Sequence, residues 1–529
     1  MKNTFKYIAL AAVVALASCE PEFENTVTDE GFYDTGSANL TNYVAVGNSL
    51  TAGYADGALY ISGQNNSYPN IMASQFAKAG AGESFTQPLM DDDLGGLSLG
   101  GTPVAANRFV LSTDANGNPF PAVLEGNATT DVTTSAAGPY NNMGVPGAKS
   151  YHLVAPGYGD ASGVLAGTAN PYFARMATSA STTVAADAAT LSPSFFSLWI
   201  GNNDILGYAT AGGAGVDQTG NLDPTTYGPN DITDPLVFGA SYTAVLDALM
   251  AGGAEGIVIN LPDVTSIPYF TTVPTAALDP TNPDFGSQIP TLNATYALLN
   301  QAFAFLGVPE RSIQFSTTAA SEVVVMDESL ANISAELTQV LAAGGLDLPT
   351  ATIFGLQYGQ ARQANEGDLM VLVSASQIGQ LNTDRMAELM ALGLPEADAA
   401  QLSVNGITFP MEDQYVLTAS EQTSVANAAA AYNATIEALA ASRNLILIDA
   451  KGELAQVANS GIPYNGGVLT DTFVTGGAFS LDGVHPTARG YAYVANLAID
   501  AINRKYNASI PTVDIGNYPT VQVHNNGGN

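Results

Sequence analysis

The chain has little of what disulfides, metal clusters and basic surfaces are made from. Its 529 residues include one cysteine, three histidines, and 14 lysines and arginines against 48 acidic residues. One cysteine cannot form a disulfide within the chain, and with three histidines it leaves no zinc cluster. The formal net charge of −34 opposes binding to nucleic acid or to anionic phospholipid surfaces. We therefore predict no nucleic-acid partner, no cofactor and no transition metal, and leave open a calcium site built from carboxylates.

Long apolar runs are also missing beyond the amino terminus, which excludes a transmembrane helix there. Residues 7–17 are apolar, follow Lys2 and Lys6, and are too few to span a bilayer permanently, as is typical of a secretory signal. The run ends in Leu16-Ala17-Ser18-Cys19, which resembles a bacterial lipobox. The resemblance implies a signal peptide over 1–18 and lipidation of Cys19. The alternative is an ordinary signal peptide with an incidental cysteine.

The residues after Cys19 are polar and acidic to about Ser37, which predicts a flexible tether over 19–38. Their acidic start resembles the surface-export signal of Bacteroidetes lipoproteins, although a solvated linker has the same composition. The expected location is the cell envelope, with the protein anchored by lipid to the outer membrane.

Four short motifs carry residues suited to catalysis. Two of them directly follow apolar runs, at 43–46 and 195–200, that are typical of buried strands. Turns after parallel strands lie at the carboxyl edge of the sheet, where open α/β sheets bind ligands. In chain order, the motifs are GNSL at 47–50, NMGVPGA at 142–148, GNND at 201–204 and DGVHP at 482–486.

The residue types fit nucleophilic catalysis on an ester. The Ser49 hydroxyl is a weak nucleophile that needs an adjacent base, which His485 supplies while Asp482 orients the imidazole. A tetrahedral intermediate needs hydrogen-bond donors for its oxyanion. The N–H of Ser49, the N–H of Gly147 and the side-chain amide of Asn203 offer three. Each motif alone also fits an ordinary turn, so the prediction depends on their combination.

These motifs, in this order, resemble the SGNH/GDSL hydrolase superfamily. The resemblance implies that Ser49 is the nucleophile, that Gly147 and Asn203 line the oxyanion hole, and that His485 with Asp482 completes the triad. It also implies a three-layer α/β/α sandwich, and residues 256–263 resemble the family's fourth block. The chain departs from the family at Asn48, where the family has aspartate.

Strands alternate with helices along the chain, which predicts an α/β fold with a mostly parallel sheet. Helices are expected at 241–250, at 488–505, and from a capping box at Thr418 and Glu421 to about Ser442. A Gly-x-Ser-x-Gly pattern at 96–100 is rejected as a nucleophile elbow because no strand–helix context surrounds it. Residues 114–118 resemble a calcium loop but are expected to form a turn between two strands.

Because the motifs span both ends of the chain, we predict one hydrolase domain over 39–510 and a frayed tail over 511–529. Insertions are expected at about 84–140 and 271–415. One hypothesis is that they form a lid over an acyl pocket; the alternative is surface elaboration away from substrate.

The predicted function is a serine carboxylic-ester hydrolase of the lipase or esterase type. Its substrate is either a lipid ester or a short acyl group, such as acetyl, on a polysaccharide, and the sequence does not decide between them. A rival from another class is a non-catalytic surface lipoprotein that binds lipid or glycan in the same cleft.

Overall fold

The computed structural model describes residues 32–523 except 83, 115, 116, 135 and 137. The predicted signal peptide, Cys19 and most of the predicted tether lie outside these residues. The described end of the tether is bound to the body: the Asp34 N–H donates to Ser509 Oγ (2.9 Å), and the Ser37 N–H to the Tyr506 carbonyl (2.9 Å). No helix within the described ranges is long and apolar enough to cross a membrane.

A sheet of five parallel strands forms the centre of the body, in the order β13–β8–β7–β1–β6. Every residue of β1 and β7 is buried, as expected for parallel strands covered on both faces. The predicted α/β class with a mostly parallel sheet is confirmed. The strands are β1 (Tyr43–Gly47), β6 (Asn142–Gly144), β7 (Phe195–Trp199), β8 (Glu255–Ile259) and β13 (Ile446–Ile448).

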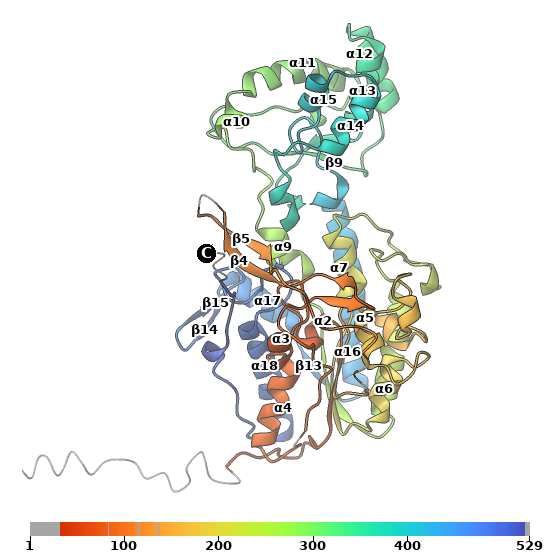
Figure 1. The fold of residues 1–529 in the computed structure, drawn as a ribbon, viewed down its shortest axis with the longest axis vertical. Helices are drawn as coiled ribbons and strands as arrows, with labels where there is room; N and C mark the ends of the chain where they lie inside the picture. The colour runs from red at the N-terminus through yellow and green to blue at the C-terminus, as the bar shows by residue number, and fades with distance from the viewer. Residues whose placement is uncertain (1–31, 83, 115–116, 135, 137, 524–529) are drawn as a thin grey trace, which may run out of the picture.

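Helices pack against both faces of this sheet (Figure 1). On one face, rings of α4 (Tyr68–Lys78) and α18 (Ala488–Tyr506) meet Tyr43 and Phe195 edge-on. On the other, α6 (Val184–Thr190) contacts β1, α16 (Ala419–Ser442) contacts β8, and α8 (Pro235–Met250) packs on both helices. The arrangement is compatible with three layers.

The strongly patterned helices lie close to their predicted positions. The capping box begins α16, where Glu421 Oε2 accepts from the Thr418 N–H (2.7 Å). The helix predicted over 241–250 is the second half of α8, and that over 488–505 is α18. The other body elements are α2 (Ser49–Ala52), α3 (Ile61–Asn65), α5 (Pro171–Met176), α7 (Asn203–Thr210), α9 (Pro268–Thr271), α17 (Ala450–Asn459), β14 (Ile462–Tyr464) and β15 (Gly467–Leu469).

The first insertion forms two antiparallel strand pairs. β2 (Leu97–Leu99) pairs with β3 (Thr102–Ala105), and β4 (Phe109–Thr113) pairs with β5 (Pro119–Val123). The calcium-like segment at 114–118 connects β4 to β5, as predicted for a turn. Ser98 lies in β2 and is followed by β3 rather than a helix, which agrees with its rejection as a nucleophile.

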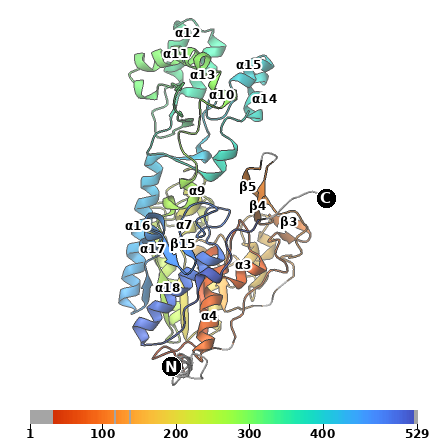
Figure 2. The same cartoon turned by 90° about the vertical axis from the view of Figure 1, so that its left-hand side faces the viewer.

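The second insertion folds into a lobe with its own hydrophobic core, which lies beyond one end of the sheet in both views (Figure 1; Figure 2). Buried side chains such as Phe303, Val324 and Leu337 form this core. The single domain predicted over 39–510 therefore contains a second hydrophobic core, which lies in the second insertion. The lobe holds α10 (Pro283–Gly286), α11 (Ile289–Phe305), α12 (Ser334–Ala343), α13 (Leu348–Tyr358), α14 (Thr383–Ala391), α15 (Glu396–Gln401), β9 (Val324–Met326) and β10 (Ala361–Gln363); β11 (Leu369–Met370) pairs with β12 (Val416–Leu417) beside it.

The carboxyl-terminal segment differs from the expected frayed tail. Ile515 is buried in the body, and the Asn496 side chain bonds both the N–H and the carbonyl of Val513 (2.9 and 2.8 Å). The Leu111 N–H donates to the Gln522 carbonyl (3.0 Å), which ties the segment to β4. These tertiary partners hold residues 511–523 although their local composition is that of a tail.

Candidate active site

Ser49 stands at the carboxyl end of the central strand β1, as the first residue of α2. The turn needs glycine before it, because a β-carbon at Gly47 would lie 2.3 Å from the Trp199 carbonyl oxygen. Asn48 caps the short helix by accepting from the Leu50 N–H (3.0 Å), and its amide donates to Asn202 Oδ1 (3.3 Å). Asn48, which stands where the family that the motifs resemble has aspartate, therefore caps the helix and also forms a hydrogen bond with the GNND motif.

His485 connects Ser49 to Asp482. Its Nε2 lies 2.8 Å from Ser49 Oγ, and its Nδ1 lies 2.8 Å from Asp482 Oδ2. An ionised carboxylate only accepts hydrogen bonds, so Nδ1 carries the hydrogen and Nε2 accepts from the serine hydroxyl. The Tyr54 ring packs against the imidazole with centroids 4.7 Å apart. This is the nucleophile, base and orienting acid arrangement expected from the sequence.

Asp482 is held ionised by the hydrogen bonds it accepts. Oδ1 accepts from the N–H groups of Val484 and His485 (2.9 and 2.8 Å), and Oδ2 also accepts from the Gly57 N–H (2.9 Å). Burial alone would raise the pKa of Asp482. The adjacent His485 and the backbone donors outweigh burial and lower that pKa to about 2.

Of the three predicted oxyanion donors, Ser49 and Asn203 line the pocket and Gly147 does not. The N–H of Ser49 belongs to the first turn of α2, where N–H groups lack an intrahelical partner. Asn203 lines the pocket. One of its two side-chain N–H groups donates a hydrogen bond to the Ala148 carbonyl (2.9 Å), and the other is available to an oxyanion. Gly147 is exposed, has φ +79° and lies beside Ala148, but it is not among the residues that line the pocket.

A buried polar network fixes the segment after Gly147 against α7. Asp204, the residue after Asn203, accepts from both the N–H and the hydroxyl of Ser150 (2.8 and 2.7 Å). Lys149 donates to the Asp231 carbonyl (2.7 Å). His152 accepts from the Lys149 N–H at Nδ1 (3.1 Å), and burial, assisted by the Lys149 charge, lowers its pKa to about 3. His152 is therefore a neutral structural histidine behind the site.

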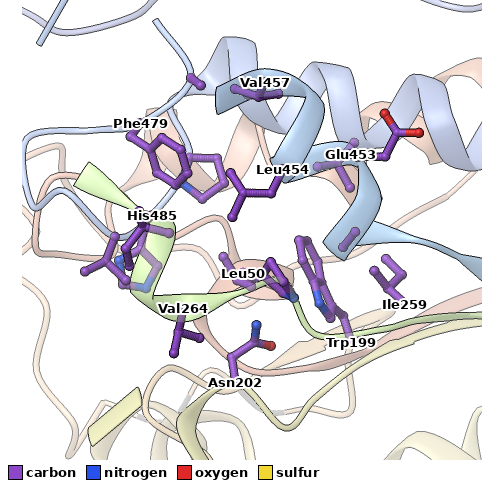
Figure 3. A pocket seen from close by; sticks show the side chains of 18 of the residues that line it. Leu50, Trp199, Asn202, Ile259, Val264, Glu453, Leu454, Val457, Phe479 and His485 are labelled. Atoms are coloured by element: carbon purple, nitrogen blue, oxygen red, sulfur yellow. The ribbon is translucent and has the colours of Figure 1, made fainter. Parts of the chain in front are cut away.

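A pocket opens at Ser49 and His485 and extends between the sheet and helices α17 and α18 (Figure 3). The empty space of this pocket, including the open solvent beyond it, is about 970 Å³. Among the described residues, neither predicted insertion contributes to its lining, so the lid hypothesis gains no support. The border of the second insertion instead contacts the catalytic loop, where the Tyr269 N–H of α9 donates to the Gly483 carbonyl (3.0 Å).

Sequence reasoning missed the walls of this pocket and the supports of Asp482. The walls include Trp199, Leu454 and Val494, which are contributed by three separate elements. Gly57 also supports Asp482 from a position 425 residues away. The only local signal was the apolar face of 488–505, which equally predicts packing against the sheet.

One acidic group outside the pocket has the composition of a cation site. Within the described ranges, Glu328, Asp413 and Glu421 bring carboxylate oxygens within 4.8 Å of one another, beside the start of α16. Burial and the neighbouring Glu328 raise the pKa of Asp413 to about 8, so this group holds a proton at neutral pH. None of the three lines the pocket; Glu328 and Asp413 belong to the second insertion and Glu421 to α16.

Comparisons of the chain with protein-family models, with curated proteins and with solved structures found no match.

Proposed function

We propose that this protein is a serine carboxylic-ester hydrolase that acts through an acyl-enzyme. One observation carries the proposal: Ser49 Oγ, the His485 ring and the Asp482 carboxylate form a continuous chain with two 2.8 Å links. Ser49 and His485 are 436 residues apart, and both lie at the mouth of a pocket. If Ser49 belonged only to an ordinary turn and His485 only to the core, nothing would require their side chains to meet.

The geometry supports a two-step mechanism. Ser49 Oγ attacks the ester carbonyl carbon while His485 Nε2 takes its proton, and Asp482 stabilises the resulting imidazolium. The oxyanion receives the N–H of Ser49 and the free amide N–H of Asn203, and Gly147 is the third candidate donor. Collapse expels the alcohol, which takes the proton from His485. Water, deprotonated by His485, then attacks the acyl-enzyme, and collapse releases the acid and regenerates Ser49.

The proposal extends to family and location. The order of the motifs along the chain and the parallel sheet that carries three of them support an SGNH/GDSL-type hydrolase with a three-layer sandwich. The lipobox-like end of the apolar run at 7–17 supports a lipoprotein of the cell envelope that is anchored at Cys19. Its substrate class is an ester of a lipid or of an acylated glycan.

The test compares Ser49→Ala with Ser98→Ala on p-nitrophenyl esters from acetyl to palmitoyl. Ser98 is the matched control because it lies in the Gly-x-Ser-x-Gly pattern and bonds Asp131 (2.7 Å), away from the pocket. We expect Ser49→Ala to lower kcat by about 10³-fold or more and Ser98→Ala to leave it unchanged. Activity that survives in Ser49→Ala, or no activity in the wild type, would reject the proposal.

A further inference from the structure

The cavity beside Ser49 lies between two layers of the fold, the sheet and helices α17 and α18, and is open to solvent. Its floor is the sheet face, where Trp199, Ile259 and Ile448 stand side by side at the ends of neighbouring strands. Its roof is formed by α17 and α18, through Leu454 and Val494 among others. In Figure 3 the side chains of Trp199, Ile259 and Leu454 lie to one side of His485, along the pocket that all four residues line.

The packing of α18 changes where the helix passes the cavity. Ala495 and Ile499 are buried against the sheet, whereas Val494 and Leu497 line the cavity and are only partly buried. Apolar side chains that line an open cavity keep part of their surface in contact with water. An apolar guest in the cavity would cover that surface and remove its own surface from water.

The walls offer few partners to a polar guest. Glu453 is occupied by the hydroxyl of Tyr493, and Figure 3 shows its carboxylate directed away from His485. The indole nitrogen of Trp199 is buried and has no hydrogen-bond partner among the described residues, so carbon atoms of the ring face the cavity. Sugar hydroxyls placed here would lose hydrogen bonds to water without replacement, which costs binding free energy.

We propose that the cavity holds the chain of a long fatty-acyl group, with its carbonyl carbon at Ser49 and its methyl end between the sheet and helices α17 and α18. This rests on the proposed hydrolase function for the position of the carbonyl. It assigns the substrate to long-chain acyl esters rather than acetyl esters. Trp199, Leu454 and Val494 become the residues that set the accepted chain length.

Binding can be measured without turnover, because Trp199 is the single tryptophan of the chain and forms a wall of the cavity. The full chain carrying Ser49→Ala is titrated with acetate, octanoate, dodecanoate and hexadecanoate while Trp199 fluorescence is followed. We expect no response to acetate, and affinity that rises about fourfold for each added methylene until the cavity is full.

Two leucine substitutions in the Ser49→Ala background test the location. Leu454→Phe adds bulk to the roof and is expected to weaken hexadecanoate binding about tenfold or more. Leu356→Phe makes the same change on the exposed face of α13, where the leucine is 65% exposed, and is expected to leave binding unchanged. Circular dichroism checks that both variants are folded, and the chain-length series needs neither of them.

The outcomes separate this inference from the proposed function. Chain-length-dependent binding in a protein that hydrolyses no ester would keep the acyl site and reject the hydrolase. Hydrolysis of acetyl esters with no fatty-acid response at Trp199 would overturn the acyl site and keep the hydrolase. Tighter binding of an aromatic acid such as ferulate than of dodecanoate would also overturn it.

Discussion

At the scale of single residues, Asp482 has the most heavily constrained side chain in the candidate site. Backbone N–H groups from two distant segments converge on it, together with the imidazole of His485. These donors select the ionised form, so the carboxylate keeps its charge throughout the neutral range. They also fix its direction, and therefore the tautomer and the plane of the imidazole ring.

Asp482→Asn is expected to lower kcat about 10⁴-fold, because an amide at this position favours the wrong tautomer of His485. The substitution also has a pH signature. The pKa of Asp482 falls from its ordinary 3.8 to about 2 on folding, so its ionisation stabilises the fold above about pH 4. That stabilisation, roughly 2.5 kcal/mol from the pKa difference, is lost as the pH falls from about 4 to about 2.

Urea unfolding of the wild type and Asp482→Asn between pH 7 and pH 2 measures this difference. The gap in unfolding free energy should shrink as the pH falls below 4. Asp500→Asn on the exposed side of α18 is the matched control and should behave as the wild type does. A gap that stays constant down to pH 2 would contradict the assigned pKa.

The sequence identified the three side chains that converge in the candidate site but not their surroundings. Asp482 and His485 are three residues apart, so a local spacing could predict their pairing, and Ser49 follows a recognisable buried strand. The Gly57 N–H reaches Asp482 only through the tertiary fold. Trp199 and Val494 line one pocket from two elements, and no local pattern distinguishes such side chains from ordinary core.

At the scale of elements, the catalytic loop rests on the root of the lobe. Gly483 has φ +71°, and a β-carbon there would lie 3.0 Å from Leu372 Cδ2 and 3.1 Å from the Tyr269 nitrogen. The loop between Asp482 and His485 therefore sits against two residues of the second predicted insertion and its border. We expect a displacement at this contact to change the His485–Ser49 distance, because Gly483 lies between Asp482 and His485 in the chain.

Gly483→Ala is expected to lower thermal stability and to lower kcat about tenfold or more, because small shifts of catalytic groups are costly. Gly379→Ala separates the two effects. Gly379 has φ +75°, and no atom lies within 4 Å of its β-carbon position. Alanine there therefore incurs the cost of a positive φ, roughly 1 kcal/mol, without the steric clash expected at position 483. Equal ester turnover in the two variants would show that the lobe contact does not position the catalytic loop.

Among the elements, the sequence predicted those with a strong local signal and missed those fixed by tertiary contact. The capping box of α16 and the buried run of β7 were both predicted close to their observed positions. The segment 511–523 was expected to fray, and it is instead held by Asn496 and by burial of Ile515. The turn-forming composition of this segment does not indicate that these partners are present.

At the scale of the whole molecule, the described part of the chain has two large hydrophobic cores. One surrounds the parallel sheet and draws residues from both ends of the chain, and the other lies within the second insertion and β12. Insertion composition alone did not predict a separate core. Units with separate cores can unfold separately, so we do not assume that the whole chain unfolds in a single cooperative transition.

We expect calorimetry to resolve two unfolding transitions. Leu337→Ala in α12 should lower only the transition of the lobe, and Leu246→Ala in α8 only that of the sheet core, each by about 2–5 kcal/mol. Both leucines are fully buried, which makes the pair a matched comparison. A single transition lowered equally by both substitutions would mean that the two cores unfold as one unit.

The 436-residue separation of Ser49 and His485 also bears on timing. During synthesis the proposed nucleophile, Ser49, leaves the ribosome 436 residues before the proposed base, His485. Until α18 docks and brings the loop before it to β1, the growing chain carries an unactivated hydroxyl. Contacts between distant parts of a chain form late in folding. A nascent chain that has not yet reached residue 485 therefore holds Ser49 without His485, and the proposed chemistry must wait until these two distant segments have folded together.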